Sequence, residues 1–239
     1  MQESEVVGLR SLAYRYFSEL LDYPYDDDIE VLDEKMEELR HLLDLLSEVM
    51  KCHAAAEKVE RAVEEYLLEL KRLGRDYFQA EYVATFELGS PKPLCPPFER
   101  EYLSPGEVSK GSFVEVTGGG RPSDELEKEM GVLASITEFY EECGVRIRNA
   151  TPDHLVVELE FLHYLVSKEF EALEDGNQEK ALEFRKRQLE FIETHLSRWL
   201  GRFSKCLKER GTLKVYYILV DALSSFMEMD AEFLRKCLF

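Results

Sequence analysis

The chain has few cysteines and no long apolar run. Its five cysteines are odd in number, widely spaced and never arranged as Cys-x-x-Cys, a usage that argues against a disulfide framework or a zinc knuckle. We therefore expect reduced thiols. No segment approaches the roughly 18 apolar residues that a membrane span needs, and the first residues are acidic where a secretory signal would be basic. These absences predict a cytoplasmic protein without a transmembrane segment.

Positive charge is also scarce. The chain has 30 Lys and Arg against 49 Asp and Glu, which gives a formal net charge of -19. Such a charge disfavours binding to nucleic acid and attracts basic segments of other proteins. Abundant Glu and Lys on solvated helix faces would give the same charge without any partner. The composition therefore permits a basic partner but does not require one.

The apolar residues repeat at helical spacing along nearly the whole chain, and no segment has the alternation of a strand. With 239 residues, 45% of them hydrophobic, the chain can bury one full core. We expect an all-α fold, a single globular bundle of about nine helices. The main helices are expected at residues 9–20, 32–50, 59–73, 76–88, 123–144, from Thr151 onward, at 178–210, and at 213–227 before a short tail.

A long loop separates two helical halves. Residues 89–122 hold six of the eight prolines and six of the thirteen glycines, and so long a loop is typically functional or a hinge. We expect an N-terminal helical half at 1–88, a hinge loop at 89–122 and a C-terminal helical half at 123–239. Together they would form one compact domain.

Motifs for catalysis and nucleotide binding are incomplete. The stretch from Gly106 to Gly111 has the spacing of a phosphate-binding loop, but Ser112 follows where lysine is required, and no strand precedes it. No Gly-x-Ser-x-Gly elbow occurs, and Cys52 and His53 are neighbours whose side chains diverge on a helix. We expect no catalytic residue, no enzymatic activity and no cofactor. Guanine-nucleotide binding stays open without a motif to support it.

A di-iron site is a more specific enzymatic alternative than the motifs for catalysis and nucleotide binding. Helical bundles build such sites from two Glu-x-x-His pairs and two further glutamates, and the chain has the pairs Glu38 with His41 and Glu160 with His163. On a helical wheel the first pair faces solvent, whereas the second lies beside the apolar positions. Because only half of a site would point inward, we expect no metal, and a di-iron oxidoreductase is the less favoured reading.

The stretch Thr151–Leu165, TPDHLVVELEFLHYL, is apolar on most sides of the wheel and should form a central helix. His154 and Glu158 lie one turn apart within it. They can bond each other or meet the cation of a partner. The alternative is structural. His154 and Glu158 would be a satisfied polar pair that contacts a neighbouring helix, and Asp153 would stabilise the helix N-terminus.

Four separated segments resemble one protein family. They are EYVATF at 81–86, PPFEREY at 96–102, PDHLVVELEFL at 152–162 and FIETHLSRWLGRF at 191–203. Their order and spacing resemble the TorD/DmsD/NarJ family of chaperones for molybdenum-cofactor oxidoreductases, the redox-enzyme maturation proteins. The chain departs from the family pattern at Thr85, Arg100 and Leu162, where the family usually has Leu, Ser and Met.

The resemblance implies an all-helical cytoplasmic chaperone that binds the twin-arginine signal peptide, or the apo-form, of a molybdopterin oxidoreductase and delays its export until the cofactor is inserted. Asp153 and Glu158 would face the arginines, and His154 would change charge near neutral pH. A helical adaptor that binds a mature or leaderless enzyme is the alternative. The chain would be a monomer or a helix-exchanged dimer. The peptide-binding residues implied by motif position are Tyr82, Phe86, Pro97, Phe98, Glu99, Tyr102, Asp153, His154 and Glu158.

Overall fold

The computed structural model describes residues 2–25, 29–50, 53–104, 107 and 123–238. Within these ranges the chain is helical and has no strand, which confirms the all-α class; its only β-type pairing is an isolated bridge between Phe98 and His154. The α-helices are α1 (Glu3–Leu21), α2 (Ile29–Met50), α3 (His53–Leu73), α4 (Arg75–Tyr82), α5 (Glu99–Tyr102), α6 (Asp124–Glu142), α7 (Leu155–Glu174), α8 (Gln178–Phe191), α9 (Ser197–Arg210) and α10 (Lys214–Leu238). Two π-helical turns, η1 (Val83–Glu87) and η3 (Ile192–Leu196), extend α4 and join α8 to α9.

Local chemistry explains several helix ends. The Ser123 side chain accepts a hydrogen bond from the Leu126 amide at 3.3 Å and caps α6 as predicted. Gly211 ends α9 with a φ of 68°, a left-handed conformation that costs glycine little. Gly74, with a φ of 81°, separates α3 from α4.

Two predicted helix boundaries were wrong. Helix α7 begins at Leu155 rather than at Thr151, because the backbone of Asp153 and Leu155 bonds to the segment before α5 instead of turning into the helix. Helix α10 continues to Leu238 where a short tail was expected. Buried Asp230 and Leu234 hold this last part of α10 against the bundle.

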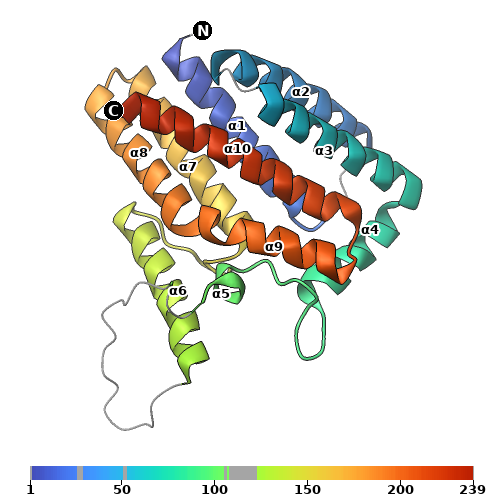
Figure 1. The fold of residues 1–239 in the computed structure, drawn as a ribbon. Coiled ribbons are helices and arrows are strands. Elements are labelled where there is room, and N and C mark those ends of the chain that lie inside the picture. The colour runs from blue at the N-terminus through green and yellow to red at the C-terminus, as the bar shows by residue number, and fades with distance from the viewer. Residues whose placement is uncertain (1, 26–28, 51–52, 105–106, 108–122, 239) are drawn as a thin grey trace.

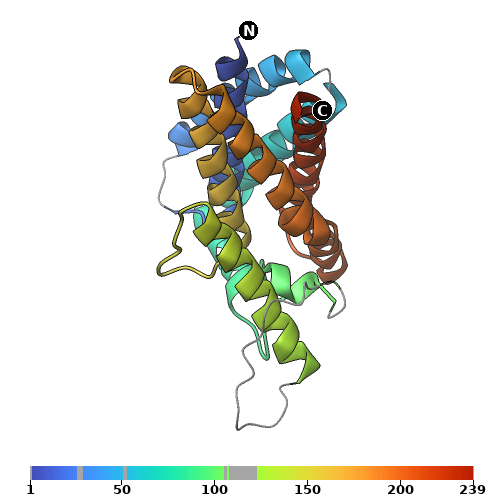
Figure 2. The same ribbon diagram turned by 90° about the vertical axis from the view of Figure 1, so that its left-hand side faces the viewer.

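The two halves of the chain interleave into one bundle. Helix α1 packs along α7, and α10 packs along α3, so N-terminal helices find their main neighbours in the C-terminal half (Figure 1). The chain ends marked in Figure 1 lie at the same end of the bundle. At the opposite end lie α5 and α6, with α6 extending below the other helices (Figure 2). In the described part of the chain, no helix combines the length and apolar character that crossing a bilayer requires.

A buried polar cluster around Arg10 ties four helices together. The guanidinium bonds to Asp230 of α10, to Glu169 of α7 at 3.1 Å and to Gln188 of α8 at 2.6 Å. The Tyr14 hydroxyl donates to Asp230 at 2.7 Å. Because each charge meets an opposite charge or a hydrogen-bonding group, the cluster can lie in the core without the cost of an unpaired ion.

The expectation of reduced thiols was wrong for two of the cysteines. Cys95, in the loop before α5, forms a disulfide with Cys206 of α9 across 111 residues of sequence. The fold brings their Cα atoms to 6.0 Å, a separation that a disulfide spans. Sequence spacing could not reveal the pair, because the loop meets α9 only through the tertiary fold. Cys143 and Cys237 are free, and Cys52 lies outside the described residues.

Candidate functional site

Two of the four motif segments meet at the start of α7. The Glu99 amide donates to the Asp153 carbonyl at 3.0 Å, and the Leu155 amide donates to the Pro97 carbonyl at 2.9 Å. These bonds make a short antiparallel pairing between the segment that enters α5 and the segment that enters α7. They explain how residues more than fifty positions apart come to share one site.

An ion pair between Asp153 and Arg100 lies at the centre of this site. The Arg100 guanidinium bonds to one carboxylate oxygen of Asp153, and the Arg100 backbone amide donates to the other at 3.1 Å. The guanidinium carbon also lies 4.5 Å from the centre of the Phe98 ring. The Asp153 side chain is fully buried, whereas that of Arg100 is 19% exposed. Burial raises the pKa of Asp153, and Arg100 opposes that rise.

Two more buried carboxyl groups lie close to Asp153. Glu99 pairs with His195 at 2.9 Å, and the Trp199 indole N–H donates to Oε2 of Glu158 at 3.4 Å. The other oxygen of Glu158 is buried and has no hydrogen-bond partner within the described residues. Burial, together with the charges of Glu99 and Asp153, raises the pKa of Glu158 well above its usual value, which favours the neutral acid.

His154 caps α7 and is neutral near pH 7. Its Nδ1 accepts a hydrogen bond from the Val156 amide at 3.3 Å. Burial, with a smaller effect of Arg100, lowers the pKa of His154 to about 4, so the expected change of charge near neutral pH was wrong. Because Nδ1 faces Val156 and Glu158 meets Trp199, the hydrogen bond between His154 and Glu158, one of the possibilities that the sequence left open, is not formed.

The apolar residues expected to bind peptide differ in exposure. Tyr82 and Phe86 expose only 4% and 6% of their surface, and Pro97 is buried. Phe98 is half-buried and meets the His154 ring edge-on at 5.1 Å. Tyr102 is half-buried and stacks on Trp199 at 5.7 Å. Phe98 and Tyr102 are thus nearest to the surface, and a groove lined by all of these residues stays a prediction.

Sequence reasoning missed three residues of the site. Arg100 was noted only as a departure from the family pattern, although an arginine beside the Pro-Pro segment could have suggested a partner for Asp153. His195 and Trp199 lie four residues apart, a spacing that places two side chains on one helix face. Their contacts with Glu99 and Glu158 depend on the approach of three separate segments, which no local pattern reveals.

The Glu-x-x-His pairs do not converge. Glu38 and His41 are exposed as predicted, and Glu160 is exposed as well, although it was expected to lie beside the apolar face. His163 bonds to Ser11 at 2.9 Å. Across the described residues, no three His, Cys, Asp or Glu side chains are grouped to hold a metal ion. Most of the Gly106–Gly111 stretch lies outside those residues.

Comparison with known proteins gives a consistent set of relatives. The chain is 33% identical over 148 residues to the chlorate reductase assembly chaperone of Ideonella dechloratans, an alignment covering 61% of this chain and 65% of that protein. It is 30% identical over 124 residues to the chaperone protein TorD of Photobacterium profundum, covering 51% and 53%. Both alignments cover less than two thirds of the relative's length.

A solved structure and a family also match. The crystal structure of a redox enzyme maturation protein from Archaeoglobus fulgidus is 20% identical with a TM-score of 0.42, over 95% of this chain and 96% of that one. Residues 32–205 match the family described as the nitrate reductase delta subunit. Because this match extends over well more than half of the 239 residues, the chain belongs to the nitrate reductase delta subunit family, the TorD-like group that its four motifs predicted.

Proposed function

We propose that the protein is a cytoplasmic, non-catalytic assembly chaperone for a molybdopterin oxidoreductase, and that it binds the twin-arginine leader of that enzyme at the surface formed by α5 and the start of α7. Support comes from relatives that are named as assembly chaperones of chlorate and selenate reductases. Binding would hold back export of the client until its cofactor is inserted.

One observation carries the proposal: the site already holds a guanidinium group. Asp153 pairs with Arg100 in a charge-assisted contact, and Phe98 lies against the guanidinium. A carboxylate beside an aromatic ring is suited to arginine, whose fork matches the carboxylate and whose plane stacks on the ring. Arg100 is the more exposed member of the pair. An arginine of the leader would take its place on Asp153 while Arg100 turns toward solvent.

The rest of the leader would add apolar contacts. A twin-arginine leader joins its arginines to an apolar stretch, and Phe98 and Tyr102 are half-buried rings on the same segment as Arg100. Burial of about 400 Å² of apolar surface at about 25 cal/mol per Å² contributes roughly 10 kcal/mol before the cost of ordering the peptide. The net affinity would then be near micromolar.

Isothermal titration of the protein with synthetic leaders tests this proposal. The twin-arginine leader should bind saturably, its twin-lysine variant more weakly, and Asp153→Asn should weaken the first interaction. Arg100→Gln should strengthen it, because the internal competitor for Asp153 is removed. Asp124→Asn is the matched control, since Asp124 is exposed on α6 and lacks an arginine partner in the described structure.

The outcomes separate the two readings of function. Equal affinity of the arginine and lysine leaders, with no effect of Asp153→Asn, would contradict the proposed site. Binding to the leaderless client enzyme without any binding to its leader would favour the adaptor alternative.

A further inference from the structure

A groove of about 780 Å³ runs along α1, the helix that packs against α7 on one side and α2 on the other (Figure 1). Its walls come from one face of α1, from Leu45 of α2, and from Ser167 and Phe170 of α7. The volume is within the roughly 300–1,000 Å³ of protein binding sites. None of the lining residues belongs to the site at α5 and the start of α7.

Apolar side chains dominate the lining of this groove. They are three leucines and one aromatic ring: Leu9, Leu12, Leu45 and Phe170. Leu12 is 39% exposed, and the other three are half-buried. A lone exposed leucine is ordinary, but apolar side chains that gather in one hollow mark an interaction site.

Two features of the groove suit an apolar guest. Gly8 has no side chain, and a Cβ atom added there would lie 3.6 Å from the Phe170 ring, so a larger side chain would fill the space. The hydroxyls of Ser11 and Ser167 are hydrogen-bonded to each other at 2.8 Å. Because these hydroxyls already have partners, a guest does not need to supply hydrogen bonds to them.

Acidic side chains flank the groove. Glu5 of α1 and Glu171 of α7 are part of its lining, and two more acids, Glu48 and Glu174, are exposed one helical turn from lining residues of α2 and α7. Among these four acids only Glu171 has a basic partner in the described part of the chain, Lys168 at 2.5 Å. The rim therefore carries an excess of negative charge, which attracts Lys and Arg side chains.

The dimensions and the charge favour a helix as the guest. Glu5 to Leu12 spans about 10 Å of the α1 axis, or two helical turns. Helices form the walls and use their backbone groups internally, so no strand edge is offered to an extended peptide. A second copy of the chain would bring the same acidic rim against itself, because a two-fold interface joins identical surfaces. A basic amphipathic helix avoids that repulsion.

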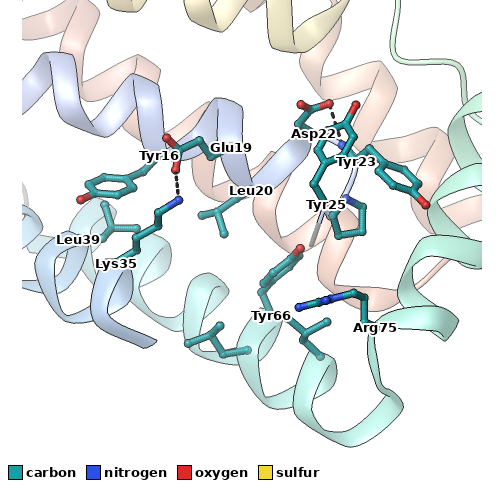
Figure 3. Close-up of a pocket in the computed structure, with 13 residues that line it drawn as sticks. Tyr16, Glu19, Leu20, Asp22, Tyr23, Tyr25, Lys35, Leu39, Tyr66 and Arg75 are labelled. Carbon is teal, nitrogen blue, oxygen red and sulfur yellow. Dashed lines mark hydrogen bonds and ion pairs between the residues drawn. The ribbon is translucent and has the colours of Figure 1, made fainter. Parts of the chain in front are cut away.

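Another hollow beside α1 does not suit such a helix. It is a cavity of about 250 Å³ between α1, α2 and α3, and Figure 3 shows the side chains that line it. Lys35 pairs there with Glu19 at 3.0 Å, and Arg75 extends toward Tyr66 (Figure 3). Two turns of a helix roughly 10 Å across need several hundred Å³, so this cavity is too small for them.

We propose that the groove along α1 binds an amphipathic helix of a partner protein, with the apolar face of that helix against Leu12 and Phe170 and its Lys or Arg side chains toward the acidic rim. Apolar contacts at helical spacing supply the affinity in this mode of recognition, and the charges favour a basic partner. The site is separate from the proposed leader site and does not depend on Asp153.

Titration with a designed helix tests the proposal. The probe is a labelled, blocked peptide of about 15 residues, near the minimum length for a helix in water, with leucines on one face and Lys and Gln elsewhere. A permuted peptide of the same composition has no apolar face, and a third peptide has Glu in place of Lys. Fluorescence anisotropy measures the affinity of each peptide for the full chain.

Two substitutions alter the groove itself. Leu12→Lys places a cation among the apolar side chains, and Gly8→Leu fills the space beside Phe170. Leu182→Lys is the matched control, because Leu182 is 37% exposed on α8, outside the groove, and the change in charge is the same. We expect saturable binding of the leucine-lysine peptide, reduced about tenfold or more by either groove variant and by less than about twofold in the control.

A second pair of substitutions tests the acidic rim. Glu5→Gln combined with Glu171→Gln should weaken binding of the leucine-lysine peptide several-fold, because two attractive charges are lost. Glu125→Gln combined with Glu138→Gln is the control, since both residues are exposed on α6 and outside the groove. The peptide with Glu in place of Lys should bind more weakly than the leucine-lysine peptide.

Several results would overturn the proposal. They are equal binding of the permuted peptide, equal effects of Leu12→Lys and Leu182→Lys, and the absence of saturable binding. Urea denaturation confirms that each variant is folded. A dimer of the wild type in sedimentation that Leu12→Lys dissociates, without any peptide binding, would overturn the proposal in favour of self-association.

Two further variants locate the bound peptide. Tyr25 is 68% exposed beside the cavity of Figure 3, so binding that is lost with Tyr25→Lys but unchanged with Leu12→Lys would place the peptide there and overturn the proposal. Binding that is lost with Leu12→Lys and survives Asp153→Asn supports the groove, even if no leader binds at α5 and α7. The reverse pattern overturns the groove and leaves the leader site standing.

Discussion

The buried charged cluster around Arg10 and the one at the start of α7 differ in whether every polar side-chain atom has a hydrogen-bond partner. Around Arg10, Asp230 and Glu169 both meet the guanidinium, and Gln188 adds a further acceptor. At the start of α7, by contrast, one oxygen of Glu158 is buried without a partner in the described structure. Satisfied buried networks help to fix a fold, whereas a buried polar group without a partner needs an explanation of its own.

Removing the Arg10 charge should destabilise the bundle strongly. Arg10→Met keeps the length of the side chain but leaves Asp230 without its cation, so we expect a loss of about 3–5 kcal/mol in the free energy of unfolding. Urea denaturation measures it. Arg15→Met is the control, because Arg15 is 57% exposed and pairs with Glu19 on the same helix; it should change stability by less than about 1 kcal/mol. Similar small losses in both variants would show that the cluster contributes little.

The raised pKa of Glu158 predicts a particular dependence of stability on pH. Because the folded pKa lies above the unfolded one, folding takes up a proton between the two values, and the wild type loses stability as pH rises through that window. Glu158→Gln does not titrate. Its stability relative to the wild type should therefore increase by up to about 1.4 kcal/mol per pH unit above about pH 4.5. Denaturation at pH 5, 6 and 7 measures the difference, and a constant difference would contradict the assignment.

At the scale of elements, the sequence predicted those features that local chemistry controls. Ser123 and Gly211 marked helix ends because capping and left-handed turns depend on one residue. Glu158 was a candidate because a charged residue interrupts an apolar stripe, whereas Asp153 was a candidate only because of its position in the family motif. The start of α7, helix α5 and the partners Arg100 and His195 were missed, because contacts between distant segments determine them.

The disulfide should hold the loop before α5 on α9. It closes a segment of 111 residues, and removing a disulfide from a small domain typically costs about 2–5 kcal/mol. The double variant Cys95→Ser/Cys206→Ser should therefore unfold at lower urea than the oxidised protein, with faster amide exchange at residues 94–104. Cys143→Ser is the control for loss of a thiol. Unchanged stability and exchange would show that the loop is held by its other contacts.

At the scale of the whole molecule, negative charge should speed and strengthen binding of a basic leader. The net charge is -19, and the screening length falls from about 10 Å at 0.1 M salt to about 3 Å at 1 M. The affinity for the twin-arginine leader should fall over this range, as measured by isothermal titration. An uncharged apolar peptide of equal length serves as the control, and an affinity for the leader that is independent of salt would contradict this role of charge.

The central claim is that Asp153 recognises an arginine of the leader directly, and a double-mutant cycle tests it most directly. Leader affinities are measured for the wild type and Asp153→Asn, each with the twin-arginine and twin-lysine leaders. Direct contact predicts that the two changes are not additive, with a coupling energy of about 1 kcal/mol or more. Additive effects, with coupling near zero, would show that Asp153 serves only to hold Arg100 and the loop in place.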